Sequence, residues 1–193
     1  MVVASLSGCG VDEGFVELNW QWVDNRQRKI YPDGYEADVC GLTGTTADGS
    51  AKYDLRLRLT ISEAECEGGP SDEGCQVMPP QIFSCRRARA SITNVPADED
   101  NPYLMSVSVV VDPLEGDETF VPLPTCASVP GPRQRRVLPG GTVDLQVFQM
   151  VMNGIDPGAD SAAGRRLDLA ACNPATAPDP MATDPQAGAD DVD

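Results

Sequence analysis

Four segments of the chain alternate between apolar and polar residues. They span residues 16–22, 53–61, 103–112 and 143–147. Successive side chains of a strand point to opposite faces, so this period predicts strands with one face on a core and one in water. Trp20 and Trp22 lie on the apolar side of the first segment, and Val143, Leu145 and Val147 form the apolar side of the last. We therefore predict that these residues point into the core.

Weaker strand patterns occur at residues 82–85, 88–95 and 120–123, and Pro122 and Pro124 restrict the last of these to a sheet edge. Turn-forming residues such as Asp, Asn, Gly and Pro separate the segments, and no segment shows helical spacing. About seven strands joined by such turns predict an all-β fold, a single antiparallel β-sandwich over residues 14–156.

The run from Ile92 to Ala97, followed by a strand opening at Tyr103, resembles a loop of small Ig-like or transthyretin-like sandwich modules. These modules include the carboxypeptidase regulatory-like domains of bacterial surface proteins. Here the glycine usual in that loop is missing, and residues 98–102 are inserted. The resemblance implies an Ig-like or transthyretin-like sandwich and carries no catalytic residue.

The end of the chain differs in composition from the strands. Residues 173–193 are mainly Ala, Pro, Asp, Thr and Gly, with no aromatic and no basic residue. Such a segment buries too little apolar surface to offset the entropy of ordering, so we predict a disordered acidic tail. Residues 157–172 form a tail segment that a disulfide at Cys172 would pin to the domain.

Charge and composition exclude several functions. The net charge is −16 and the sequence has no histidine. The negative charge argues against nucleic acid as a partner, because binding to phosphates depends on Lys and Arg. The absence of histidine rules out a Ser-His-Asp triad and a histidine-ligated metal site. The chain has no run of about 18 apolar residues, so we expect no membrane-spanning helix.

The segment Leu6-Ser7-Gly8-Cys9 resembles the lipobox of bacterial lipoprotein signal peptides. The resemblance implies cleavage before Cys9 and a lipid on its thiol, so residues 1–8 would belong to the signal peptide and residues 9–13 to a tether. Gly10 stands where an aspartate would favour inner-membrane retention, which indicates the outer membrane. Only eight residues, none basic, precede Cys9, so we expect translation to start upstream. The alternative is that Cys9 is an ordinary cysteine.

Six cysteines remain when Cys9 is set aside, and an even number in an exported chain predicts three disulfides. Six cysteines allow 15 pairings, and the sequence does not choose among them. Our preferred pairs are Cys40–Cys85, Cys66–Cys75 and Cys126–Cys172. A thiolate metal site is the alternative, but the chain has no Cys-x-x-Cys pair. We therefore predict no metal site and no cofactor.

Two sets of side chains are candidates for ligand binding. Arg56 and Arg58 share the polar face of one predicted strand, and Arg87 and Arg89 share a face of another. If the two strands are neighbours, a basic stripe forms that could bind an anionic glycan, lipid headgroup or partner. The alternative, which we favour, is that these arginines pair with the thirty carboxylates.

The second candidate set is aromatic. Tyr31 and Tyr35 flank the turn at residues 32–34 and could stack on a sugar, although anchoring of the loop is the interpretation that we favour. Acidic loops at residues 98–100 and 112–118 could hold calcium, but neither has the order of an EF-hand loop, and we interpret them as solvated turns.

These observations predict a cell-envelope lipoprotein of the outer membrane, facing the periplasm or the surface, with a structural or interaction role and no catalytic residues. Its partners would be the membrane, through the lipid, and an envelope protein or glycan. One alternative is a module that binds a surface ligand or glycan. A less favoured alternative is a carboxylate-dependent hydrolase, which needs two carboxylates held close together in a cleft.

Overall fold

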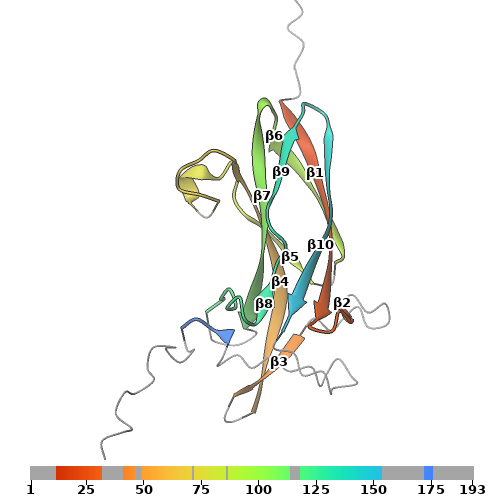
Figure 1. The fold of residues 1–193 in the computed structure, drawn as a ribbon, viewed down its shortest axis with the longest axis vertical. Helices are drawn as coiled ribbons and strands as arrows, with labels where there is room; N and C mark the ends of the chain where they lie inside the picture. Colours follow the sequence, from red (N-terminus) through yellow and green to blue (C-terminus); the bar gives the residue numbers. More distant parts are fainter. Residues whose placement is uncertain are drawn as a thin grey trace, which may run out of the picture.

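A computed structural model describes residues 12–31, 41–46, 49–70, 72–85, 87–113, 118–153 and 172–175. Two β-sheets pack face to face and form a β-sandwich (Figure 1). The predicted all-β sandwich is therefore confirmed. Its strands lie between residues 13 and 152.

The first sheet, sheet A, is built around the first strand of the chain. Its strands are β1 (Glu13–Asp24), β2 (Lys29–Tyr31), β6 (Arg89–Pro96), β8 (Ala127–Ser128) and β10 (Thr142–Met152). β6 and β2 pair with successive parts of β1, and β10 pairs with β1 on its other edge and also with β8. The β1–β10 pair is parallel, which differs from the antiparallel arrangement expected. Parallel neighbours need a long connection, and the rest of the domain supplies it.

The second sheet, sheet B, is more regular. Its strands are β3 (Gly41–Thr46), β4 (Gly49–Glu63), β5 (Gln81–Ser84), β7 (Asp98–Pro113) and β9 (Arg133–Val137). β4 and β7 pair without a register shift from Tyr53–Pro113 to Glu63–Tyr103. β3 and β5 lie along β4, and β9 lies along β7. A short 3₁₀ turn, η1 (Glu73–Cys75), lies in the connection between β4 and β5.

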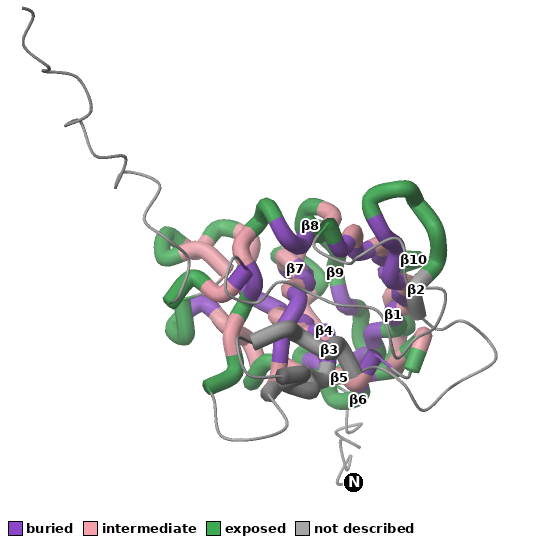
Figure 2. Tube along the Cα trace, turned by 90° about the horizontal axis from the view of Figure 1, so that it is seen from below, coloured by how far each residue is buried: buried purple, intermediate pink, exposed green. Residues whose placement is uncertain are grey.

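The core lies between the two sheets, as Figure 2 shows by the buried segments on the facing strands. Trp20 is 2% exposed and Trp22 is fully buried, which confirms their predicted position. From β4 and β7 the apolar alternation also points inward, from Leu55 to Ile61 and from Tyr103 to Val111. The period of two thus correctly identified the buried face of these three strands.

In β10 the alternation predicts the wrong face for one residue. Val147 was expected in the core, but it is 51% exposed, whereas Phe148 is fully buried. The register between β1 and β10 shifts here, and Gln146 has a positive φ of 57°. Its backbone N–H donates to the Asp144 carboxylate at 2.6 Å. This bulge adds one residue to β10 and moves every later side chain to the opposite face.

The weaker strand predictions have mixed outcomes. Segments 82–85 and 88–95 correspond to β5 and β6, whereas segment 120–123 contributes only a single bridge between Phe120 and Val111. The prolines of that segment cannot donate to a ladder, which explains its short pairing. Four short strands, β2, β3, β8 and β9, were not predicted from the sequence. β9 has the sequence Arg-Gln-Arg-Arg-Val and shows almost no apolar alternation.

A charged side chain of β9, in sheet B, contacts β10 of sheet A. The Arg133 guanidinium lies 4.0 Å from the centre of the buried Phe148 ring, and its Nη2 donates to the Val147 carbonyl at 2.8 Å. Burial lowers the pKa of Arg133 below its ordinary value, although a guanidinium stays protonated in a protein. The cation therefore joins β9, at the edge of sheet B, to β10 of sheet A.

Candidate functional site

The disulfides agree with the predicted pairs as far as the described residues extend. Cys66 and Cys75 form one disulfide, and Cys126 and Cys172 form another. Cys85 is also disulfide-bonded, and its predicted partner Cys40 lies outside the described residues. The loops that these disulfides close span 9 and 46 positions. The longer one ties Cys172, near the end of the described chain, to the loop before β8.

Two predicted sites fall wholly or partly outside the described residues. Cys9, the proposed lipidation site, is one of them. Tyr35 is another, so the predicted tyrosine platform is not tested. Tyr31 ends β2, where its backbone pairs with Trp22 of β1. The tail from residue 176 onward, expected to be disordered, also lies outside the described residues.

The basic stripe proposed from the sequence does not form. Arg56 and Arg58 lie on β4 in sheet B, whereas Arg89 lies on β6 in sheet A and Arg87 just before it. The strands β4 and β6 belong to different sheets, so the four arginines are not on one face. The similar alternation of the two strands gave no information on which sheet each would join.

On sheet B the two arginines have cross-strand partners. Arg56 forms an ion pair with Asp112 of β7, with 2.7 Å between nitrogen and oxygen. Arg58 donates from Nε to the Ser108 hydroxyl at 3.1 Å. For Arg56, the carboxylate pairing that we favoured is confirmed. The outer face of sheet B is therefore polar here, and both arginines are bound to side chains of the neighbouring strand β7.

On sheet A the arginines are arranged differently. Arg89 pairs with Asn19 of β1, and Ser91 pairs with Glu17. These side chains lie on the outer face of the sheet, because their neighbours Leu18 and Ile92 are buried in the core. Neither Arg87 nor Arg89 forms an ion pair with any residue that the structure describes.

These residues surround a hollow of about 550 Å³, which we call the sheet A hollow. Its lining side chains are polar or charged and come from β1, from β6 and from the residues just before β6: Glu17, Asn19, Arg87, Arg89 and Ser91. Leu18 and Ala90 complete the lining, with their side chains packed into or against the core. Ligand pockets have volumes of roughly 300–1,000 Å³, so the hollow can hold a small ligand.

A row of glutamines continues the same face toward the β1–β2 turn. The Gln21 amide nitrogen donates to the Gln149 oxygen at 2.8 Å, and the Gln149 nitrogen donates to Gln27. Gln27 has a positive φ of 63° in the turn. The outer face of sheet A thus presents amide groups beside the hollow, in positions fixed by cross-strand hydrogen bonds.

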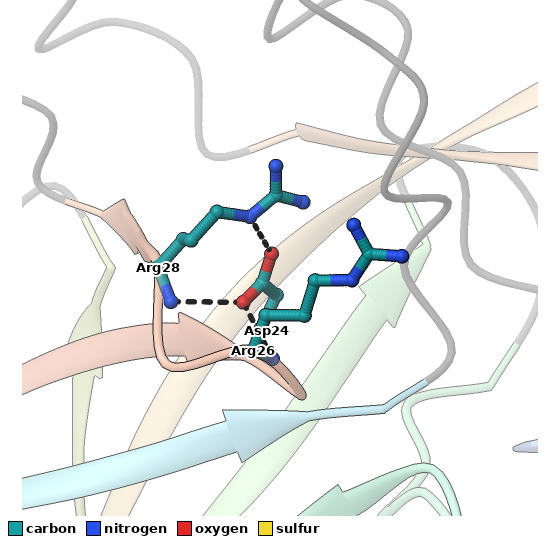
Figure 3. Close-up of polar contacts among 3 residues, drawn as sticks. All are labelled: Asp24, Arg26 and Arg28. Atoms are coloured by element: carbon teal, nitrogen blue, oxygen red, sulfur yellow. Dashed lines mark hydrogen bonds and ion pairs between the residues drawn. The ribbon is translucent and has the colours of Figure 1, made fainter.

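The β1–β2 turn is fixed by the buried carboxylate of Asp24, which is 4% exposed (Figure 3). Its oxygens accept hydrogen bonds from the backbone N–H groups of Arg26 and Arg28, at 2.9 and 2.8 Å, and from the Arg28 Nε at 2.6 Å. Burial alone would raise the pKa of Asp24, but these hydrogen bonds and the Arg28 charge lower it below 3.8. We interpret this cluster as a structural lock on the turn.

A second, smaller hollow of about 300 Å³ is acidic and is lined in part by Glu63, Glu65, Asp98 and Tyr103. The Asp98 carboxylate accepts hydrogen bonds from the backbone N–H groups of Asp100 and Asn101. These bonds, first that from Asn101, lower the pKa of Asp98. Within the described ranges no group of three or more Cys, Asp and Glu side chains is placed to hold a metal ion. Residues 98–100, which we interpreted as a solvated turn, instead form the start of β7, where Asp98 pairs with Val137 of β9.

Among the residues of the hollow, Arg87 and Arg89 were predicted from the sequence, whereas Glu17, Asn19 and Ser91 were not. Each of these three occupies a polar position of an alternating strand, which usually marks only a solvated face. Their grouping depends on the pairing of β1 with β6, which no local pattern indicates. The one available hint was that both strands carry polar residues opposite a strongly apolar face.

Comparisons with protein-family models, with curated proteins and with solved structures gave no match for this chain. In the part of the chain that the structure describes, no helix has the length and apolar character needed to cross a membrane. The chemistry of the sheet A hollow is therefore interpreted from its own residues.

Proposed function

We propose that the chain is a cell-envelope lipoprotein of the outer membrane, anchored through Cys9, with a structural or interaction role and no catalytic activity. The observation that carries the proposal is disulfide bonding. Cys66, Cys75, Cys85, Cys126 and Cys172 are all disulfide-bonded. Disulfides persist mainly in oxidising compartments outside the cytoplasm, which is where lipoproteins of this kind reside.

The lipobox supports the same location. The segment Leu6-Ser7-Gly8-Cys9 ends three residues before the first described residue, Asp12, which lies next to β1. A short tether of residues 9–13 would then hold the sandwich close to a membrane surface. In this arrangement, the partners are the lipid bilayer and an envelope protein or glycan that contacts the sandwich.

We also propose that the sandwich is of the Ig-like or transthyretin-like kind. The residues that carry this resemblance, Ile92 to Ala97, form the end of β6 and the single-residue link to β7. This link carries the chain from sheet A to sheet B. A chain that changes sheets between successive strands is a feature of such sandwiches.

The test is the chemical state of the mature amino terminus. The full-length gene, with its natural upstream sequence, is expressed in a bacterium, and the membrane-bound product is extracted and analysed by mass spectrometry. We expect a chain that begins at Cys9 and carries acyl groups. A matched variant, Cys9→Ser, should lose the lipid and leave the membrane fraction while it keeps its disulfides.

A mature protein that begins at an unmodified Met1 would contradict the anchor. Free thiols at the five described cysteines, counted after denaturation of the isolated protein, would contradict the oxidising location. The two results are separable, because the first concerns Cys9 and the second concerns the sandwich.

A further inference from the structure

The sheet A hollow contains two cationic side chains in a strongly acidic molecule. The chain has 30 acidic and 14 basic residues, yet Arg87 and Arg89 are exposed and have no ion-pair partner among the described residues. Two such guanidinium groups beside one hollow favour an anionic ligand, because an arginine can donate two parallel hydrogen bonds to a carboxylate.

The other side chains of the hollow narrow the choice of anion. Glu17 is exposed and would repel a ligand that carries negative charge on all sides. It would accept hydrogen bonds from hydroxyl groups, and Asn19 and Ser91 can both donate to and accept from them. The hollow therefore suits a ligand with a carboxylate on one side and hydroxyl groups on the other.

Side chains on both sides of the hollow offer further contacts to a sugar ligand. Phe15, two residues before Glu17 on the same face of β1, is 39% exposed and offers an apolar surface to the C–H face of a sugar ring. On the other side, the Gln21–Gln149 pair presents amide groups. An extended ligand of several sugar units would lie along β1, and contact with both Phe15 and Gln21 needs a span of about 20 Å, since they lie six residues apart on the strand.

We propose that the sheet A hollow binds an acidic oligosaccharide built from uronic acid units, with Arg87 and Arg89 on a carboxylate and Glu17, Asn19 and Ser91 on hydroxyl groups. This deepens the interaction role proposed above, and it does not depend on the anchor at Cys9. The net negative charge of the chain does not prevent such binding, because physiological salt screens charges beyond about 8 Å. The charged side chains that line the hollow, Arg87, Arg89 and Glu17, then leave a net positive charge beside it.

The test is calorimetric titration of the full oxidised chain with trigalacturonic acid, with maltotriose as the neutral sugar and sodium sulfate as the simple anion. We expect trigalacturonic acid to bind at least about tenfold more tightly than either of the other two. Arg89→Gln and Arg87→Gln should each weaken it by about tenfold or more. Both side chains are exposed, so the variants should keep the melting temperature of the parent.

The matched control is Arg58→Gln, which removes the same charge from the outer face of sheet B and should leave the affinity within about twofold. Glu17→Gln should bring sulfate binding closer to that of trigalacturonic acid, since it removes the repulsion of simple anions. The proposal is overturned if trigalacturonic acid does not bind at millimolar concentration. It is also overturned if sulfate binds equally well, or if Arg58→Gln weakens binding as much as Arg89→Gln. None of these results bears on the mature amino terminus.

Discussion

The two sheets of the sandwich differ in regularity. In sheet B the central pair β4–β7 keeps one register over eleven positions, and among the described pairs of this sheet a register shift occurs where β9 lies along β7, between Asp98 and Tyr103. In sheet A the register shifts in the pairing of β1 with each of its three neighbours. The three non-glycine residues with positive φ among those described, Gln27, Asn94 and Gln146, all lie in sheet A or its first turn.

In sheet B, the more regular sheet, Arg56 and Arg58 bind side chains of the same sheet. Sheet A, the less regular sheet, carries the hollow. Bulges redirect side chains and interrupt pairing, and they occur often near binding sites. Asn94 lies in the bulge of β6, where two residues of β6 oppose Phe15 of β1, beside the hollow. We infer that sheet B mainly supports the core and that sheet A presents the ligand-binding groups.

The largest expected effect tests the bulge of β10. Phe148→Ala should lower the free energy of unfolding by about 3–5 kcal/mol, because it empties a fully buried position. Val147→Ala should change it by no more than about 0.5 kcal/mol, because Val147 is half exposed. Urea denaturation measures both values. If the two substitutions cost the same, β10 does not shift its faces at Gln146.

The second largest change in stability is expected at Asp24, whose charge fixes the first turn of sheet A. Asp24→Asn should lower stability at pH 7 by about 1–2 kcal/mol, because it weakens three hydrogen bonds to a buried carboxylate. The pKa of Asp24 is lowered in the folded state, so its stabilisation is present above about pH 3.8 and is lost as the pH falls through the folded pKa. The difference between the two proteins should therefore shrink in acid.

The control for this prediction is Asp112→Asn on sheet B, which removes a partly exposed ion pair. It should cost less than about 1 kcal/mol. Denaturation of all three proteins over a pH series checks both statements. An Asp24→Asn penalty that stays constant down to the folded pKa and below it would show that the carboxylate charge does not stabilise the turn.

The smallest expected changes in stability come from glycine substitutions, which compare the backbone conformation of the two sheets directly. Gln146→Gly should raise stability by up to about 1 kcal/mol, because glycine adopts a positive φ without strain. Ser106→Gly, in the regular strand β7, should lower stability by about 0.5–1 kcal/mol, since glycine loses more entropy in an extended strand. Thermal melts of the two variants should therefore shift in opposite directions. Shifts of the same sign would remove the contrast between the sheets.

The contrast also explains which features the sequence could predict. Alternation correctly assigned Trp20, Trp22 and the inner faces of β4 and β7, because regular strands translate a period of two directly into burial. It failed at Val147 because one bulge residue reverses the phase. β9 was missed because an edge strand can be almost wholly polar.

The candidate site was predicted only in part for a related reason. Arg87 and Arg89 were selected because two arginines at alternate positions stand out in an acidic chain. Glu17, Asn19 and Ser91 could not be selected, since their grouping arises from the pairing of strands far apart in the sequence. The cysteine count, in contrast, was informative: the preferred pairs Cys66–Cys75 and Cys126–Cys172 are both present.

The most direct measurement of the binding proposal is an NMR titration of the ¹⁵N-labelled, oxidised chain with trigalacturonic acid. We predict that the largest amide shifts occur at residues 17–19 and 87–91, which border the sheet A hollow, while β4 and β7 of sheet B stay nearly unchanged. Shifts concentrated around Arg56 and Arg58, or no shifts at millimolar ligand, would contradict the assignment of binding to sheet A.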